Sequence, residues 1–310
     1  MTSLEIPDPH PFADVVRLPR DDEGARPHEV TAHGALHWAP HHDAGFSGRM
    51  NEIAAWVSQA RPEAVVVDVS VEVAAFVRLL GVPVIVMALP GKRIDGPHVF
   101  VHRLADHIVA AWPRALCVPP WLRQWEHKTS YVGGISRFEG RDRSDDEPTS
   151  SVRIRPLDET QVVVLSGAGE EWGASLQDCA AAHSVLSWTA LGGKDGSWAD
   201  DPWPKIRAAD VVVTHAGQGC VADVAAAQRP AVVIPRPRPF DEQHATARAL
   251  QRHRLAVVTQ GLPDPRDWAA LLSNAMAIDP HRWRRWEVDG ASRRAAEAIE
   301  STARRCRNGT

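Results

Sequence analysis

The sequence has few cysteines, and those that it has are far apart. Cys117, Cys179, Cys220 and Cys306 are the four in 310 residues, and no two of them form a CxxC pair. Zinc knuckles and disulfide frameworks need closely spaced or numerous cysteines. The pattern therefore argues against both kinds of site and fits a reducing compartment.

Long apolar runs and an excess of charge of one sign are also missing. No window approaches the roughly 18–20 apolar residues of a membrane-spanning helix, and residues 1–16 lack the basic start and apolar core of a signal peptide. The 35 Lys and Arg residues face 39 Asp and Glu, for a net charge of −4, which gives no electrostatic argument for binding nucleic acid. We expect a cytoplasmic protein with no transmembrane segment and no nucleic-acid partner.

What the sequence does have is length and alternating apolar segments. With 310 residues and 44% hydrophobic content it can form two domains. Two continuous apolar runs, at 64–69 and 82–89, suggest strands that are buried on both faces. Between them, Ser70 is a candidate N-cap and Gly81 a candidate end of a helix. The elements predicted for the first half are a helix at 49–62, strands at 64–69 and 82–89 around a helix at 70–81, and further short strands at 107–112 and 114–118.

The second half repeats this alternation after a charged segment rich in Ser and Pro at 136–160, which indicates a linker. Strands that alternate with helices predict a doubly wound α/β fold. The predicted elements are a strand, a glycine loop and a helix within 161–183, strands at 184–191, 211–215, 231–237 and 255–261, and helices at 205–210, 220–230, 241–254, 265–277 and 281–306.

The segment 211–223, VVVTHAGQGCVAD, is the most informative stretch. In doubly wound folds, ligands bind at the carboxyl ends of strands, where the next helix begins. Gly217 and Gly219 remove side chains at such a turn, and amides such as those of Gln218 and Cys220 would face an anion together with the helix dipole. A diphosphate fits this turn, and an ordinary turn that uses glycine for steric ease is an equal alternative.

Polar residues follow at two places. Asp223, one turn into the helix, could accept hydrogen bonds from a ribose hydroxyl pair. After the next strand, Arg236 lies in a proline-rich loop, and Asp241, Glu242 and Gln243 cluster at a helix N-terminus. This cluster suits the hydroxyls of a sugar, although helix capping is the favoured alternative for the cluster taken alone.

The glycine turn with Asp223 and the later cluster that ends in Gln243 together resemble the donor domain of GT-B glycosyltransferases of families 28 and 1. That domain carries His-x-Gly-x-Gly-Ser, an acid four residues after the second glycine, and later a Pro that is followed, after a short loop, by Asp or Glu and then Gln before a helix. The matching positions are His215, Gly217, Gly219, Asp223, Pro235, Glu242 and Gln243. Cys220 stands in place of the usual serine, and Asp223 in place of the usual glutamate.

This resemblance implies two Rossmann-like domains that face a cleft: an acceptor side at 1–140, a linker at 141–158, a donor domain at 159–280 and a C-terminal helix at 281–310. It implies that the turn from Gly217 to Cys220 binds the diphosphate of a UDP-type donor, that Asp223 binds the ribose, and that Glu242 and Gln243 bind the donor sugar.

The resemblance also adds candidates elsewhere in the donor domain. The loop after its first strand faces the phosphates in the family, which makes Ser166, Gly167 and Gly169 candidates. Trp198 lies near the place of the base, or is a rim aromatic. Because this class neutralises the diphosphate with protein groups, we expect no metal and no cofactor.

The N-terminal domain departs from the family pattern. The acceptor domain of the family opens with a strand and a glycine-rich loop that often ends in Gly-His, and this histidine or a nearby acid acts as the base. Here only the part from about residue 64 onward resembles an acceptor domain. We therefore expect an incomplete N-terminal domain, through a start assigned too late or a true truncation. Asp68, at the end of a strand, is the candidate base, although capping of the next helix is the favoured alternative.

The leading hypothesis is a metal-independent, inverting glycosyltransferase that takes a nucleotide diphosphate sugar, with UDP as the expected nucleotide, and an unknown hydroxyl acceptor. A nucleotide-sugar epimerase would share the donor pocket. From another class, the chain could be a nucleotide-sugar-binding subunit, or an inactive truncated homologue, that needs a second copy or a completing partner.

Overall fold

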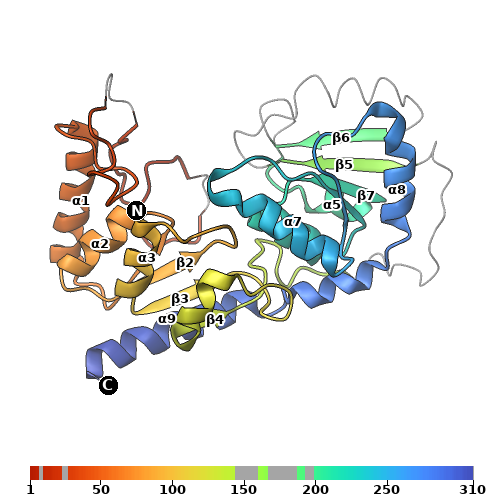
Figure 1. The fold of residues 1–310 in the computed structure, drawn as a ribbon. Coiled ribbons are helices and arrows are strands. Elements are labelled where there is room, and N and C mark those ends of the chain that lie inside the picture. The colour runs from red at the N-terminus through yellow and green to blue at the C-terminus, as the bar shows by residue number, and fades with distance from the viewer. Residues whose placement is uncertain (7–9, 23–26, 144–159, 167–186, 193–198, 310) are drawn as a thin grey trace.

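The computed structural model describes residues 1–310 except 7–9, 23–26, 144–159, 167–186, 193–198 and 310. It contains two parallel sheets, each with helices packed against it, that lie side by side (Figure 1). The strand orders are β1-β2-β3-β4 in the N-terminal sheet and β6-β5-β7-β8-β9 in the C-terminal sheet. The predicted α/β architecture with parallel sheets is confirmed.

The N-terminal sheet is covered on one face by its own helices and on the other by the C-terminal helix. Its elements are α1 (Ala44–Ala60), β1 (Val65–Asp68), α2 (Val71–Leu79), β2 (Val84–Ala88), α3 (Gly96–Leu104), β3 (His107–Ala110), η1 (Pro120–Lys128) and β4 (Thr129–Tyr131). Side chains of β2 alternate between the faces: Val84 and Val86 pack with the cluster of α1 and α2, and Ile85 packs with Ala295 of α9. A strand buried on both faces reads as a continuous apolar run for this reason.

Local signals placed the ends of α2 correctly. Ser70 Oγ accepts a hydrogen bond from Val73 N at 3.2 Å, as an N-cap does. Gly81 follows the helix with φ +80°, a conformation that glycine adopts without steric penalty.

Two predictions for this sheet were wrong. The strand β1 is an edge strand, and Val66 is 41% exposed, so it is not covered on both faces. The predicted strand at 114–118 is a turn, because the Pro113 carbonyl accepts hydrogen bonds from the amides of Leu116 and Cys117. The fourth strand of the sheet is β4, which pairs with β3.

The C-terminal sheet is doubly wound. Its elements are β5 (Gln161–Leu165), β6 (Ser187–Leu191), α5 (Trp203–Ala208), β7 (Val211–Thr214), α6 (Gln218–Ala227), β8 (Ala231–Val233), η4 (Pro239–Asp241), α7 (Glu242–Arg252), β9 (Val257–Val258), η5 (Pro265–Asp267) and α8 (Trp268–Met276). Val162 of β5 packs with Trp268 of α8, whereas Val163 packs in the cluster that contains Val221 of α6. Each strand and helix predicted between 184 and 277 overlaps an observed one among the described residues, although β8 and β9 are shorter than predicted. The helix expected within 161–183 lies outside these residues.

The predicted helix at 281–306 is interrupted. A short helix, η6 (Pro280–Trp286), ends at Glu287 with φ +56°, and Gly290 with φ +78° precedes α9 (Ala291–Asn308). The interruption lets α9 run back beneath the N-terminal sheet (Figure 1). There the Arg294 guanidinium donates to the Val132 carbonyl at 2.9 Å. The C-terminal helix and the N-terminal sheet therefore share one hydrophobic cluster. No helix among the described residues is long and apolar enough to cross a membrane.

Candidate functional site

The turn between β7 and α6 presents helix-start amides without a side-chain cap. Thr214 Oγ1 donates to the Leu165 carbonyl at 2.8 Å and fixes the end of β7 against β5. Gly217 is the N-cap of α6 and has no side chain to accept from the helix. The Gly217 carbonyl accepts from Val221 N at 3.0 Å, so Gln218 to Cys220 form the first turn. Amides in a first turn have no partner within the helix and point along its axis.

The space over this turn is open. A Cβ built on Gly217 or on Gly219 would meet no atom of the described residues within 4 Å. Packing inside the protein therefore does not require glycine at either position. An open space above the amides of a positive helix end suits a phosphate group. Cys220 lies half-buried in the same turn.

Asp223 is engaged from outside its own domain. Its Oδ1 accepts from Ser136 Oγ at 2.7 Å and its Oδ2 accepts from Arg137 Nε at 3.3 Å. The side chain is buried, and burial raises the pKa of this carboxyl while Ser136 and Arg137 oppose the shift. Asp223 thus ties α6 to the segment before the linker. Its predicted contact with a ribose stays a prediction and would have to share or replace these bonds.

The loop between β8 and α7 is held by Gln243. This side chain is buried, and its Oε1 accepts from Arg236 N at 2.9 Å. Phe240 and Asp241 both have φ +60°, a left-handed conformation that is uncommon outside glycine. The Asp241 carboxylate pairs with Arg248 at 3.1 Å. The predicted sugar-binding cluster is therefore presented on a tightly constrained turn.

Glu242 faces the N-terminal domain. Arg93, on the loop after β2, donates through Nη2 to Glu242 Oε2 at 2.9 Å. The Arg93 side chain is 4% exposed. Burial lowers the pKa of its guanidinium, and the Glu242 carboxylate partly offsets the shift. The predicted donor-sugar residue thus lies in an interdomain ion pair that the sequence did not indicate.

The same arginine begins a hydrogen-bonded chain of imidazoles. Arg93 Nη1 lies 3.3 Å from His98 Nε2, His98 Nδ1 lies 2.6 Å from Asp95 Oδ1, and Asp95 Oδ2 lies 2.7 Å from His37 Nε2. An arginine only donates, so His98 Nε2 accepts and the proton of His98 is on Nδ1. Asp95 then accepts from both imidazoles, and the lone pair of a neutral His37 is on Nδ1.

The charges of this cluster support the hydrogen-bond assignment. Burial lowers the pKa of His98, although Asp95 opposes the shift, and this favours a neutral imidazole. Partial burial opposes ionisation of Asp95, but the bonds from His37 and His98 outweigh it, and the net pKa of the carboxyl is lowered. The result is an ionised carboxylate that orients two imidazoles.

The ligand atoms of His37, Asp95 and His98 all lie within 4.8 Å of one another, close enough to surround a metal ion. A histidine binds a metal ion through a ring nitrogen that carries no proton. The bond from Arg93 keeps the proton on His98 Nδ1, the atom that faces the cluster, and a second cation would lie beside the guanidinium. The chemistry of the cluster favours a hydrogen-bonded relay. Sequence analysis missed it because His37 precedes Asp95 by 58 residues.

The remaining predicted positions are dispersed. Asp68 is exposed at the end of β1, and nearby protein raises the pKa of its carboxyl through desolvation. Ser166 is buried, and its amide donates to the Leu191 carbonyl at 3.0 Å. His215 is buried, with Nδ1 3.3 Å from the Ile234 carbonyl. The predicted residues Gly167, Gly169 and Trp198 lie outside the described residues.

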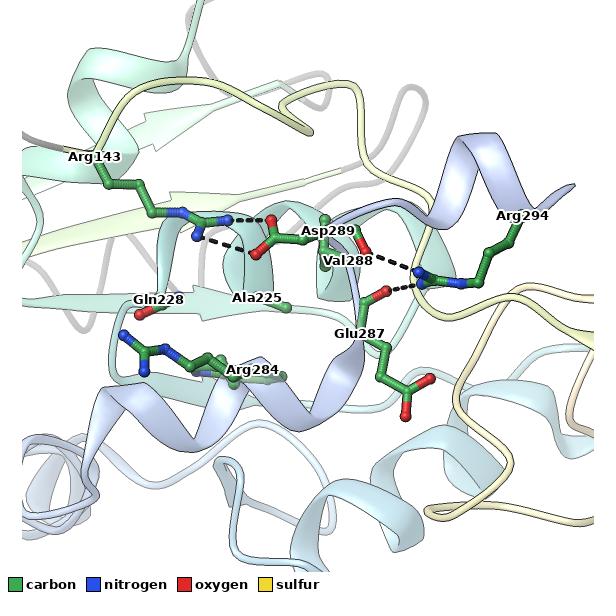
Figure 2. Close-up of a pocket in the computed structure, with 9 residues that line it drawn as sticks. Arg143, Ala225, Gln228, Arg284, Glu287, Val288, Asp289 and Arg294 are labelled. Carbon is green, nitrogen blue, oxygen red and sulfur yellow. Dashed lines mark hydrogen bonds and ion pairs between the residues drawn. The ribbon is translucent and has the colours of Figure 1, made fainter. Parts of the chain in front are cut away.

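A hollow lies at the other end of α6 (Figure 2). It has a volume of about 310 Å³ and is lined by residues of α6, η6 and the start of α9, including Gln228 at the C-cap of α6. Arg143 pairs with Asp289 at 2.8 Å, and Arg294 donates to the Asp289 carbonyl at 2.9 Å and the Glu287 carbonyl at 2.6 Å. These guanidiniums join chain segments, and none of the predicted donor residues lines the hollow. We interpret it as a structural junction.

Comparison with known proteins supports the donor domain directly. Residues 197–261 match the model of the glycosyltransferase family 28 C-terminal domain, a range that contains the α6 turn and the loop before α7. A curated protein of Rubrobacter xylanophilus, a UDP-N-acetylglucosamine--N-acetylmuramyl-(pentapeptide) pyrophosphoryl-undecaprenol N-acetylglucosamine transferase, is 29% identical over 195 residues. The match covers 54% of this chain and 53% of the relative, so the chain spans about half the length of the curated relative that it matches.

Solved structures that share the fold include proteins named as glycosyltransferases. The glycosyltransferase of kitacinnamycin superposes with a TM-score of 0.59 at 17% identity, over 84% of this chain and 80% of the other. Acinetobacter baumannii MurG superposes with a TM-score of 0.55 at 17% identity, over 82% and 77%. At this identity the likeness shows the fold alone.

The two parallel sheets and these superpositions define a protein of the GT-B glycosyltransferase fold. Within that fold, the segment 197–261 is similar to the glycosyltransferase family 28 C-terminal domain.

Proposed function

We propose that this protein transfers a sugar from a nucleotide diphosphate sugar to a hydroxyl acceptor, with inversion and without a metal ion. The observation that carries the proposal is the α6 turn, where the start of a helix with a glycine N-cap borders space over Gly217 and Gly219 that the described residues leave open. The turn lies inside the segment that matches the family 28 C-terminal domain.

The donor proposed first is a UDP sugar. The curated relative is named for UDP-N-acetylglucosamine, and that compound is the probe to test first. Glu242, with one oxygen on Arg93, is proposed to accept from a sugar hydroxyl, and Gln243 holds the loop that presents it. The α6 amides and helix dipole would stabilise the diphosphate that leaves, which is the role a metal has in other transferases.

An inverting transfer also needs a base that takes the proton of the acceptor hydroxyl. Asp68 remains a candidate, because the residue is accessible at the end of β1 and desolvation of its carboxyl raises the pKa, which makes it a better base than an ordinary aspartate. His37 is the second candidate, since Asp95 orients its ring and leaves the lone pair on Nδ1. In either case the deprotonated oxygen attacks the sugar carbon opposite the C–O bond that breaks, and UDP leaves with that electron pair.

Calorimetric titration tests the binding step. UDP and UDP-N-acetylglucosamine should bind in the presence of EDTA, and thymidine diphosphate serves as a matched pyrimidine nucleotide. If none of the three ligands gave a heat of binding, the proposal would be contradicted. Donor turnover by the Asp68→Asn and His37→Gln variants then separates the two candidate bases. Only the variant that lacks the true base should have lower turnover with unchanged donor affinity.

A nucleotide-sugar-binding subunit is the second candidate function. The edge strand β1 pairs only with β2 in the described residues, and Val66 is 41% exposed there. An open strand edge can add a strand of another chain. Donor binding without turnover by the isolated chain, with turnover restored by a partner or a longer chain, would favour this function.

A further inference from the structure

Arg93 belongs to the N-terminal domain but is built into the donor side. Its guanidinium donates to Glu242 Oε2 at 2.9 Å and to His98 Nε2, and its Cζ lies 4.6 Å from the centre of the Phe240 ring. A side chain as long as arginine is rarely buried without such partners. Three neighbours fix the planar group here, two of them hydrogen-bond partners.

The backbone around this contact leaves no room for a looser arrangement. Lys92 N donates to the Phe240 carbonyl at 2.6 Å. A Cβ on Gly91 would overlap that carbonyl oxygen and would lie 2.9 Å from the amide nitrogen of Glu242. The left-handed conformations of Phe240 and Asp241 are costly for such residues, so surrounding contacts must hold the turn. The two domains therefore meet here through a defined interface.

The ion pair uses half of the Glu242 carboxylate. Arg93 contacts Oε2, whereas Oε1 makes no hydrogen bond to the described part of the chain, and the side chain is 26% exposed. A carboxylate has about four lone-pair sites. A fixed carboxylate with one accessible oxygen is therefore preorganised to accept from a ligand hydroxyl.

We propose that Arg93 is a positioning residue for the donor sugar, which acts by holding the Glu242 carboxylate in its sugar-binding orientation. This inference rests on the proposed function. It gives the N-terminal domain a part in donor recognition, beyond acceptor binding. The opposite role is a latch, in which the sugar must displace Arg93 to reach Glu242, and the two roles predict opposite effects on affinity.

The experiment measures Kd values for UDP and UDP-N-acetylglucosamine by calorimetry with wild-type protein, Arg93→Met and Arg93→Lys. For Arg93→Met we expect the Kd of the nucleotide sugar to rise roughly tenfold, as for loss of a charged hydrogen bond, and the Kd of UDP to stay within about twofold. Arg93→Lys should recover part of the loss, because an ammonium can reach one partner but cannot bridge two as the guanidinium fork does.

The control is Arg114→Met, which removes an exposed arginine that pairs with exposed Glu126 in the same domain. It should leave both Kd values unchanged. An equal loss for both ligands in Arg93→Met would make Arg93 a structural residue, and tighter binding of the nucleotide sugar would make it a latch. Either result overturns the inference, as does an unchanged Kd of the nucleotide sugar. Wild-type protein that binds neither ligand would instead refute the proposed function itself.

Discussion

The substitution Gly219→Val tests the diphosphate turn most directly. Gly219 is exposed in the first turn of α6, and a Cβ there meets no atom within 4 Å. The valine side chain can therefore be accommodated by the protein but would occupy the space above the amides. Because glycine costs about 1 kcal/mol in a helix relative to alanine, and valine costs less than glycine, the unliganded variant should be as stable as wild type or slightly more stable.

The effect on ligand binding should be large by comparison. A ligand at 100 times its Kd stabilises the folded state by about 2.7 kcal/mol. At about 2–4 °C per kcal/mol for domains of 150–250 residues, UDP should raise the Tm of wild-type protein by roughly 5–10 °C. In Gly219→Val this increase should disappear while the Tm without ligand is kept. The measurement is a thermal denaturation series over UDP concentration.

Gly261→Val is the matched control, because a Cβ on Gly261 also meets no described atom within 4 Å and the residue follows β9, which β8 separates from β7 in the sheet. It should keep the full UDP shift. An undiminished shift in Gly219→Val would refute the assignment of the diphosphate to this turn, and a lower Tm without ligand would show that the open space is smaller than the structure indicates.

Three further substitutions test other parts of the structure. Burial, together with nearby positive charge, lowers the pKa of His102 to about 3. Below pH 6.5 the unfolded chain binds a proton that the folded protein excludes, so the free energy of unfolding should fall by about 2 kcal/mol between pH 7 and pH 5. Urea unfolding of His102→Phe over the same pH range should show a smaller loss. Arg294→Met removes a guanidinium that donates to three backbone carbonyls and should lower the free energy of unfolding by about 2–4 kcal/mol, whereas Arg293→Met, which breaks an exposed ion pair, should change it by less than about 0.5 kcal/mol. Gln243→Ala removes the acceptor of Arg236 N and should weaken calorimetric binding of UDP-N-acetylglucosamine more than that of UDP; equal weakening would show that Gln243 only holds the loop.

The sequence by itself determined the features that depend on near neighbours in the chain. The apolar runs of β2 and β7 indicated buried parallel strands, because side chains that point to both faces must all be apolar when both faces are covered. Ser70 indicated the start of α2, and its hydroxyl accepts from Val73 N. The glycines before and within α6 indicated an anion site, because the direction of helix-start amides is set by residues that are near in the sequence.

Only the tertiary structure decided which distant side chains meet. Nothing in the spacing of Arg93 and Glu242, which are 149 residues apart, or of His37 and Asp95 indicates a contact, because their positions depend on how the two domains dock. A local pattern also cannot show that β1 is an edge strand, since burial depends on what packs against the sheet. The helical pattern after residue 281 likewise continued through Glu287 and Gly290, where the structure turns to bring α9 back to the N-terminal sheet. Docking, sheet order and chain reversal are set by burial of apolar surface over the whole molecule, and that free energy has no local signature.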